Sequence, residues 1–242
     1  MILGVDVGGT FTDFFLWDGY AIRTAKLPTT TSDLSEAVLQ GASELAEHVD
    51  AFLHGTTAAT NALLERTGAR TLLVTSPGFE DVIEIGRQDR PSLYDPFVDR
   101  PEPLVQRSDR ISDLSDADLN EFEAVAVSLL RSYENPSQEQ EIGRQLARLA
   151  PEAAVSLSSD VVAEFREFER TSTTVLNAYL TPVVADYLAR LEEGVRSSGL
   201  ADAVAVMRSS GGLISGSDAA ALPASILLSG PAGGVVAAAA IG

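Results

Sequence analysis

Residues 6–13 read DVGGTFTD, and this stretch decides the fold of the first part of the chain. The apolar run before it, residues 1–6, predicts a buried strand. Residues 10–17 are rich in aromatic and β-branched side chains and predict a second strand. Because a strand follows Gly8 and Gly9 so closely, the two glycines are expected to form a turn between strands rather than to open a helix.

Strands and helices alternate along the rest of the chain, which predicts an α/β fold with mixed sheets. Asp18-Gly19 is a hairpin signal, so residues 20–27 are expected to add a third, antiparallel strand. Further strands are expected at residues 49–53, 69–75, 124–130, 153–157, 203–207 and 225–228. Helices are expected at residues 34–48 with Thr31, Ser32 and Asp33 as N-cap candidates, after residues 54–57 up to Gly68, at residues 136–149, within residues 161–197 with a long helix from Thr171, and from Ser229 with Pro231 near its start.

Composition excludes several classes of protein. Asp and Glu total 35 against 17 Lys and Arg, and the net charge of −18 disfavours nucleic acid and anionic membranes as partners. Lys26 is the single lysine. Without cysteine and with two histidines, disulfides, thiol catalysis and a zinc site are not expected. No apolar run reaches the length of a membrane span and no signal peptide is evident, so a cytoplasmic protein is expected.

The glycine turn has the chemistry of an anion-binding loop. It lacks the lysine of a Walker A motif, and a Rossmann fingerprint would open a helix. Gly8 and Gly9 are expected to adopt positive φ and to let a ligand approach the backbone, whose N–H groups form an anion nest. Thr10 and Thr12 add hydroxyl donors, and Asp6 can hold Mg²⁺ through water. The alternative is a hairpin that uses glycines for geometry alone.

A second candidate element is HGTT at residues 54–57. Thr56 and Thr57 would lie at a helix N-terminus, where N–H groups favour an anion, and His54 could act as an acid or base. Asn61 lies one turn further along the helix. The alternative is that Thr56 caps the helix and His54 packs at the end of a strand.

Two further segments carry charged side chains. Residues 76–113 contain five prolines and are expected to form a long ordered loop with short helices. Arg87 in this loop could clamp a carboxylate or phosphate, or be an ordinary surface arginine. Residues 164–170 favour a solvated helix face in which Glu167 and Arg170 pair at i, i+3.

The DxGGT turn resembles the first phosphate loop of the actin-like ATPase superfamily, which has a ribonuclease H-like fold. The fuller string resembles the hydantoinase A and 5-oxoprolinase family, in particular its N-methylhydantoinase A-like members. Further blocks resemble that family in the same order along nearly the whole chain: HGTTAATNALLERTGARTLLVTSPGF, DVIEIGRQDRPSLYD, SLLRSYENP, EFREFERTSTTVLNAYLTP, MRSSGGLIS and LLSGPAGGVV.

This resemblance implies an ATP-dependent hydrolase that opens cyclic amides. ATP with Mg²⁺ would phosphorylate the amide oxygen before water attacks. The implied catalytic residues are Asp6, His54, Thr56 and Thr57, with Asp6 also at the metal. The implied cofactor-binding residues are Gly8, Gly9, Thr10, Thr12 and Asp13, and the implied substrate-binding residues are Arg87 and Asn61.

The resemblance also implies a division of the chain. Residues 1–170 would form an actin-like lobe, and residues 171–242 a connecting helix and the start of a second lobe. Family members continue into a second phosphate loop and an adenosine pocket, so the chain is expected to be incomplete as a catalyst and to need its C-terminal half or a hydantoinase B-like partner. The alternatives are an acetone carboxylase-type subunit, another actin-like phosphotransferase and a non-catalytic binding lobe.

Overall fold

The computed structural model describes residues 1–29, 34–95, 97–116 and 118–241. The chain folds into two compact units, residues 1–68 with 183–242, and residues 69–182. This division differs from the boundary expected at residue 170, because the chain leaves the first unit after Gly68 and returns to it at Val183.

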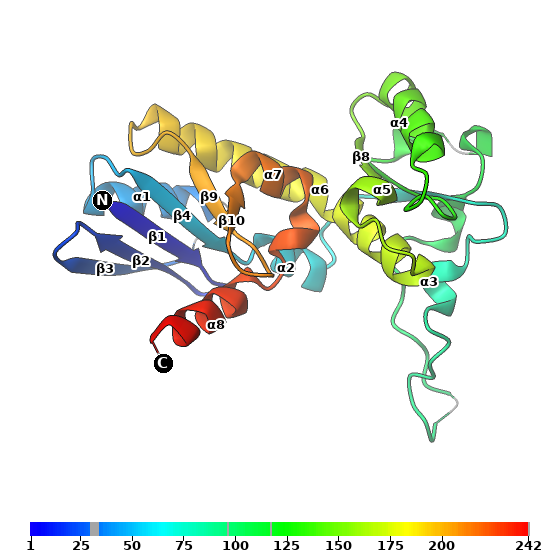
Figure 1. The fold of residues 1–242 in the computed structure, drawn as a ribbon, viewed down its shortest axis with the longest axis horizontal. Helices are drawn as coiled ribbons and strands as arrows, with labels where there is room; N and C mark the ends of the chain where they lie inside the picture. Colours follow the sequence, from blue (N-terminus) through cyan, green and yellow to red (C-terminus); the bar gives the residue numbers. More distant parts are fainter. Residues whose placement is uncertain (30–33, 96, 117, 242) are drawn as a thin grey trace. The chain divides into compact units, whose positions relative to one another are not determined.

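The first unit is built on a mixed six-stranded sheet in the order β10-β9-β4-β1-β2-β3 (Figure 1). Its strands are β1 (Ile2–Val7), β2 (Phe11–Trp17), β3 (Ile22–Pro28), β4 (Ala51–Thr56), β9 (Val204–Met207) and β10 (Leu213–Ser215). The predicted antiparallel meander is confirmed, since β1 pairs antiparallel with β2 and β2 with β3. In the middle of the sheet β4 runs parallel to both β1 and β9.

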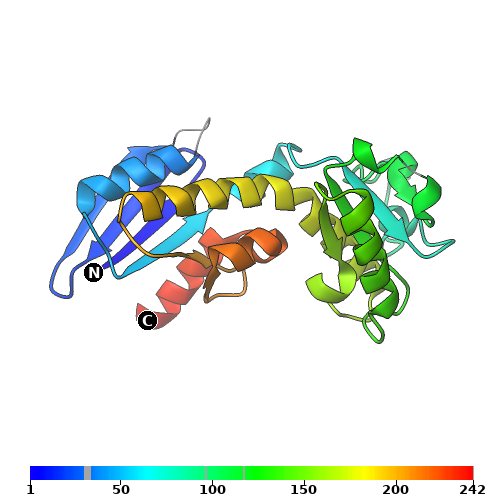
Figure 2. The same cartoon turned by 90° about the horizontal axis from the view of Figure 1, so that it is seen from above.

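Helices cover the two faces of this sheet unequally. The helices of this unit are α1 (Leu34–Leu45), α2 (Ala58–Leu64), the C-terminal part of α6 (Glu167–Ser197), α7 (Gly216–Ala221), η4 (Pro223–Ile226) and α8 (Ser229–Ile241). One face buries Leu3, Val5, Phe14 and Leu16 beneath α1, and α6 contacts this face at His54 of β4 through Tyr187. The other face is contacted by α8 over β4 and β9 and is otherwise open (Figure 2).

The second unit contains a parallel four-stranded sheet in the order β6-β5-β7-β8. Its elements are β5 (Thr71–Thr75), α3 (Val82–Ile85), η1 (Arg107–Asp109), β6 (Arg110–Ile111), η2 (Leu114–Asp116), η3 (Leu119–Glu121), β7 (Ala124–Ser128), α4 (Ser137–Leu149), β8 (Ala154–Leu157), α5 (Ser158–Val161) and the start of α6. Every residue of β5 and β7 is buried, as expected for parallel strands with both faces covered. Residues 76–109 form the predicted irregular stretch with short helices.

Several predicted elements need correction. Residues 225–228 do not form a strand; η4 lies there, and β10 and α7 were not predicted. Helix α2 ends before Gly68, because Arg66 takes the left-handed φ of 54° and Thr67 N–H bonds to the Ala62 carbonyl. Helix α6 already begins at Glu167 and α1 already ends at Leu45. The N-cap candidates Thr31, Ser32 and Asp33 lie outside the described residues.

Within the described part of the chain, no helix has the length and apolar character needed to cross a membrane.

Candidate functional site

A row of charged side chains crosses the open face of the first unit's sheet. Asp6 on β1 lies opposite Gly55 on β4 and opposite Asp13 on β2, and Asp13 lies opposite Lys26 on β3. Side chains alternate between the two faces of a strand, so cross-strand partners such as these share one face. The register therefore brings Asp6, Asp13 and Lys26 together beside the glycine turn.

Gly55 makes room for the Asp6 carboxylate. A Cβ atom at residue 55 would lie 2.6 Å from Asp6 Oδ1 and 3.4 Å from its Cγ. The glycine of HGTT is thus needed for a close approach of the neighbouring strand's side chain. The sequence alone did not explain why residue 55 is a glycine.

The turn at residues 8–10 is tied to the sheet but open to a ligand. Gly8 N–H donates to the Phe11 carbonyl at 3.0 Å, and Thr29 N–H donates to the Thr10 carbonyl at 2.9 Å. Neither Gly8 nor Gly9 has positive φ, so that expectation was wrong. At Gly9 a Cβ atom would meet nothing within 4 Å, whereas at Gly8 it would lie 3.1 Å from the Phe11 carbonyl oxygen. Gly8 therefore allows close packing against the Phe11 carbonyl, and Gly9 leaves space open at the turn. Neither glycine is needed for a left-handed backbone.

Thr12 does not face the ligand side of the turn, contrary to expectation. Its place opposite Val7 turns its side chain to the buried face, where it is fully buried. Its hydroxyl lies 3.1 Å from the Thr29 hydroxyl, which donates to the Gly8 carbonyl at 2.9 Å. Thr12 therefore supports the turn from behind. Thr10 is exposed at the turn itself.

His54 and Asp6 point to opposite faces of the sheet, and the His54 ring packs against α6, which agrees with the structural alternative given for it. His54 lies opposite Val5, is 1% exposed, and its Nε2 lies 2.7 Å from the Tyr187 hydroxyl on α6. Burial lowers the pKa of His54 from 6.5 to about 4, against a smaller opposing effect of the Val5 backbone. The ring is a neutral part of the interface between β4 and α6.

The threonines of HGTT also bond to backbone. Thr56 is buried and its hydroxyl accepts from Ala58 N–H at 3.1 Å. The Thr57 hydroxyl donates to the Val7 carbonyl at 3.1 Å and is 3.4 Å from the Asn61 amide nitrogen. These contacts join the end of β1 to the start of α2, so in this structure Thr56, Thr57 and Asn61 make contacts that position the two elements.

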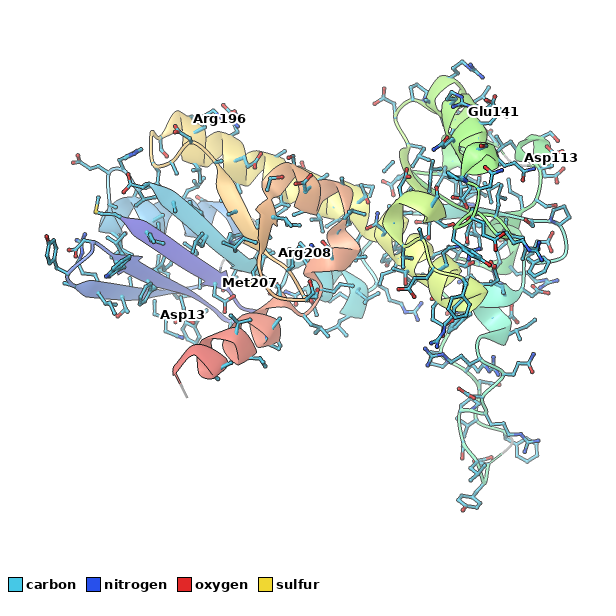
Figure 3. The ribbon with its side chains drawn as sticks, viewed as in Figure 1. Asp13, Asp113, Glu141, Arg196, Met207 and Arg208 are labelled. Carbon is cyan, nitrogen blue, oxygen red and sulfur yellow. The ribbon has the colours of Figure 1, made fainter. Side chains whose placement is uncertain are left out.

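A cavity of about 1020 Å³ lies on the open face, and the row of charges lines it. Asp6, Asp13 and Lys26 line it together with residues of β4, β9 and α8. Gly233 of α8 packs near Met207, which is labelled with Asp13 in Figure 3. The Ser229 hydroxyl donates to the Thr56 carbonyl at 3.4 Å, which ties the start of α8 to the end of β4. The small residues of SGPAGG thus border the cavity.

The carboxylates fit a partly hydrated Mg²⁺. Partial loss of hydration, and secondarily the charge of Asp13, raises the pKa of Asp6, and a nearby cation would relieve both effects. Among the described residues no group of three or more His, Cys, Asp or Glu side chains is placed to hold a metal ion. Mg²⁺ commonly takes one or two carboxylates and completes its shell with water and phosphate oxygens, which suits this pair.

Arg87 belongs to the second unit. Its Nε donates to Glu169 Oε1 at 2.7 Å, and it lines a cleft of about 700 Å³ with Arg90, Arg100 and Phe168. The ion pair is well exposed and contributes little to stability.

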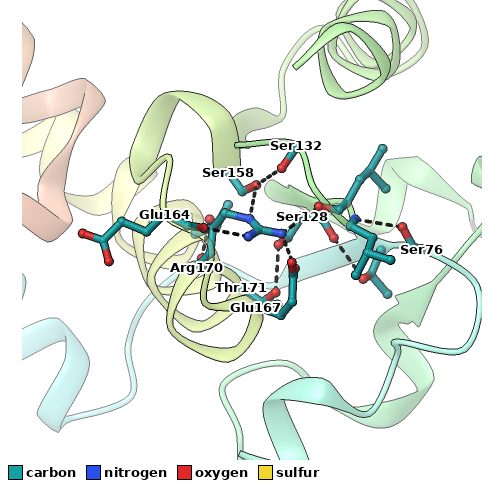
Figure 4. A network of polar contacts seen from close by, with 12 residues as sticks. Ser76, Ser128, Ser132, Ser158, Glu164, Glu167, Arg170 and Thr171 are labelled. Carbon is teal, nitrogen blue, oxygen red and sulfur yellow. Dashed lines mark hydrogen bonds and ion pairs between the residues drawn. The ribbon is translucent and has the colours of Figure 1, made fainter. Parts of the chain in front are cut away.

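Sequence reasoning missed a buried polar network in the second unit (Figure 4). Arg170 is fully buried, and its guanidinium donates to the Ser158 hydroxyl at 3.1 Å and to the Leu129 and Glu164 carbonyls at 2.8 Å each. It also pairs with Glu167, as expected from their spacing. The expected solvated face is seen at residues 163–166, which are exposed, but not at Arg170, which Leu129 and Ser158 help to enclose.

Gly55→Ala is expected to displace the Asp6 carboxylate while leaving the fold intact. The added methyl group meets the end of a side chain that can rotate, so the free energy of unfolding should change by less than about 1 kcal/mol. Affinity for ATP·Mg²⁺, measured by ligand-observed NMR, should fall severalfold. Gly4→Ala is the matched control, since its Cβ atom would lie 3.9 Å from the Phe15 carbonyl oxygen. Equal affinities for both variants would contradict the role given to Gly55.

Comparisons with known proteins show which family the chain resembles. Residues 2–120 match the hydantoinase/oxoprolinase N-terminal region, and residues 170–242 match hydantoinase/oxoprolinase. The chain is 36% identical to an uncharacterized protein of Methanocaldococcus jannaschii, over 97% of this chain and 39% of that protein. It is 33% identical to the caprolactamase subunit alpha of Pseudomonas jessenii, over 88% of this chain and 36% of the subunit.

Two solved structures share the fold. The crystal structure of ATP-dependent caprolactamase from Pseudomonas jessenii matches 93% of this chain and 38% of its own, with a TM-score of 0.78 and 31% identity. Nucleotide-free acetone carboxylase matches all of this chain and 40% of its own, with a TM-score of 0.85 and 24% identity, which shows the fold alone. The chain thus spans less than half the length of each of these relatives. The α/β fold with its mixed sheet is consistent with an actin-like ATPase lobe, and the chain belongs to the hydantoinase/oxoprolinase family.

Proposed function

We propose that this chain provides a nucleotide-binding lobe of an ATP-dependent hydrolase that opens a cyclic amide. The observation that carries the proposal is the Asp6 carboxylate, which faces the cavity above Gly55 and directly precedes the open turn at residues 8–10. A caprolactamase that is ATP-dependent shares this fold at 31% identity, and a lactam is a cyclic amide. The reaction, the substrate and the partners of the whole protein are likewise proposed.

The chain's own residues would position charge rather than perform covalent chemistry. ATP with Mg²⁺, when bound, would supply the phosphoryl group that turns the amide oxygen into a leaving group, so that water can attack the ring carbon. Asp6 and Asp13 would hold the hydrated ion, and Thr10 with the backbone at Gly8 and Gly9 would hold phosphate oxygens. Fixed dipoles and charges of this kind lower the barrier because they need no rearrangement during the reaction.

His54, Thr12, Thr56 and Thr57 have a supporting role in this proposal. Thr57 bonds to the Val7 carbonyl at the end of β1, and Thr12 bonds to Thr29, which in turn bonds to Gly8, so these two would fix the turn. His54 bonds to Tyr187 on α6 and Thr56 to the Ala58 N–H of α2, so these two would fix β4 beside Asp6. Arg87 in the second unit is proposed to bind a carboxylate or phosphate group of the substrate. Completion of the catalyst would come from the portion of the relatives that this chain does not span, or from a hydantoinase B-like subunit.

Asp6→Asn is expected to weaken ATP·Mg²⁺ binding at least tenfold, because the amide keeps the shape of the side chain but loses the charge that holds the ion. Binding to this chain alone is expected in the millimolar range, so ligand-observed NMR with and without Mg²⁺ is the suitable measurement. Asp202→Asn, at an exposed aspartate of the same unit, is the matched control and should bind as the original chain does. Unchanged affinity in Asp6→Asn, or binding that is independent of Mg²⁺, would refute the proposed role of Asp6.

A further inference from the structure

Lys26 is singular both in the sequence and in the site. It is the one lysine among 17 basic residues, so the chain otherwise uses arginine for positive charge. Among the described residues that line the sheet-face cavity, Lys26 is also the one that carries a positive charge, since His54 is neutral. Neither property follows from the family resemblance or from the residues assigned above.

The Lys26 ammonium group lies over the open face of the sheet rather than off its edge. Its Nζ is 2.7 Å and 2.9 Å from the two Asp13 carboxylate oxygens and 5.0 Å from the centre of the Phe11 ring. Lysines on edge strands such as β3 often serve to prevent pairing with other chains. Here the charge is directed inward, toward the row of aspartates, so that explanation does not account for its placement.

Stability does not account for the Lys26–Asp13 pair either. The two side chains are 55% and 56% exposed, and ion pairs so accessible to water contribute about 0–1 kcal/mol. A lysine held loosely by one carboxylate can exchange that partner for another anion at small cost. Its compact ammonium group is a common ligand of phosphate.

The charge balance of the cavity requires such a group. Asp6 and Asp13 lie opposite each other, and an anion that enters the cavity would meet two carboxylates. Lys26 offsets one of these charges. It is also the lining residue that can attract phosphate oxygens without a metal ion.

We propose that Lys26 is a binding residue for the phosphate groups of the ligand in this cavity, with Asp13 as the residue that positions it. The inference rests on the proposed function for the identity of the nucleotide, but not for the class of ligand, a polyphosphate. On binding, the Lys26 ammonium group moves its hydrogen bonds from the Asp13 carboxylate to phosphate oxygens. No covalent bond changes.

The single lysine allows a direct test on the 242-residue chain. Limited acetylation, followed by peptide mass spectrometry, measures the labelling rate at Lys26 and at the Met1 amine, which pairs with Asp50 and serves as the internal control. Inorganic tripolyphosphate with Mg²⁺, and separately ATP with Mg²⁺, are the probes. At saturating probe we expect labelling of Lys26 to slow at least fivefold, with the rate at Met1 unchanged.

The two probes separate this inference from the proposed function. Protection of Lys26 by tripolyphosphate and by ATP supports both the role of Lys26 and the proposed nucleotide site. Protection by tripolyphosphate without any binding of ATP supports the role of Lys26 and contradicts the nucleotide site. Binding of ATP, shown by NMR, with no protection of Lys26 overturns the role of Lys26, and absence of binding by either probe overturns both.

Substitutions distinguish direct contact from charge balance. Lys26→Gln should weaken tripolyphosphate binding about tenfold, Lys26→Arg much less, and Arg23→Gln, on the opposite face of the same strand, not at all. The double variant Lys26→Gln, Asp13→Asn restores the net charge of the row without the ammonium group, and its binding is measured with metal-free tripolyphosphate because Asp13 is proposed above to help hold Mg²⁺. Binding as weak as in Lys26→Gln supports direct contact, whereas recovered binding overturns it. Because the ion pair is exposed, all four variants should fold, which circular dichroism checks.

Discussion

Arg170→Met is expected to lower the free energy of unfolding of the second unit by about 3–5 kcal/mol. The guanidinium group is fully buried and satisfies the Leu129 and Glu164 carbonyls, the Ser158 hydroxyl and the Glu167 carboxylate. Methionine fills much of the volume but leaves these acceptors without their donor. An unpaired buried acceptor costs more than the hydrogen bond contributed, so the loss exceeds that of an ordinary ion pair.

A matched ion pair on the same unit gives the control. Arg144 and Glu141 on α4 have the same i, i+3 spacing, but their side chains are 62% and 50% exposed. Arg144→Met should change the free energy of unfolding by less than about 0.5 kcal/mol. Urea unfolding followed by circular dichroism, with hydrogen exchange at the amides of β5 and β7 to report on this unit, measures both variants. Equal losses in the two variants would mean that the Arg170 network is not shielded from water.

Glu139 explains why the network holds together without solvent. Its carboxylate is fully buried and accepts from the Leu129 N–H at 2.7 Å, the Ser158 hydroxyl at 2.7 Å and the Ser159 N–H at 2.9 Å. The Arg170 guanidinium and the Glu139 carboxylate thus bond to the same hydroxyl group, that of Ser158. Arg170 also bonds to backbone carbonyls and to Glu167, and Glu139 also bonds to backbone N–H groups.

The sequence predicted the meander and the alternation of elements because both depend on local patterns. Residues 10–17 are rich in aromatic and β-branched side chains, and a two-residue signal at 18–19 closes the hairpin. In the structure residues 11–17 alternate strictly between exposed and buried side chains. The failure at residues 225–228 has a physical reason. A short apolar run has no periodicity that separates a strand from a buried helical turn, and Leu228 takes a left-handed φ of 57° that no strand allows.

The sequence did not predict which face of a strand each site residue occupies. Asp6 and Asp13 were assigned to the site together with Thr12 and His54, yet the side chains of Thr12 and His54 lie on the buried face. Their alternation with Phe14 and Phe52 was visible in the sequence and could have placed them there. The close approach of Gly55 to Asp6, and the burial of Arg170, depend on partners distant in the chain, and no local pattern carries that information.

The stability of the first unit is expected to depend on pH through His54. In the folded chain burial lowers the pKa of this ring to about 4, whereas the unfolded chain has the ordinary value of 6.5. Between these pH values the unfolded state binds a proton that the folded state does not, so stability rises with pH across this window. The contribution of His54 is complete above about pH 6.5 and is lost as the pH falls toward 4. It amounts to about 3 kcal/mol.

His54→Gln removes the titration but keeps an amide group that can bond to the Tyr187 hydroxyl. Trp17 is the single tryptophan and lies in the first unit, so its fluorescence reports unfolding there. From pH 7 to pH 4.5 the original chain should lose stability relative to His54→Gln, with a slope approaching 1.4 kcal/mol per pH unit. Carboxylates that titrate in the same range are common to both proteins and cancel in the difference. Tyr187→Phe keeps the buried ring and should retain the slope. Parallel curves for the original chain and His54→Gln would show that water reaches the ring, and that β4 and α6 are less tightly packed around it than the structure indicates.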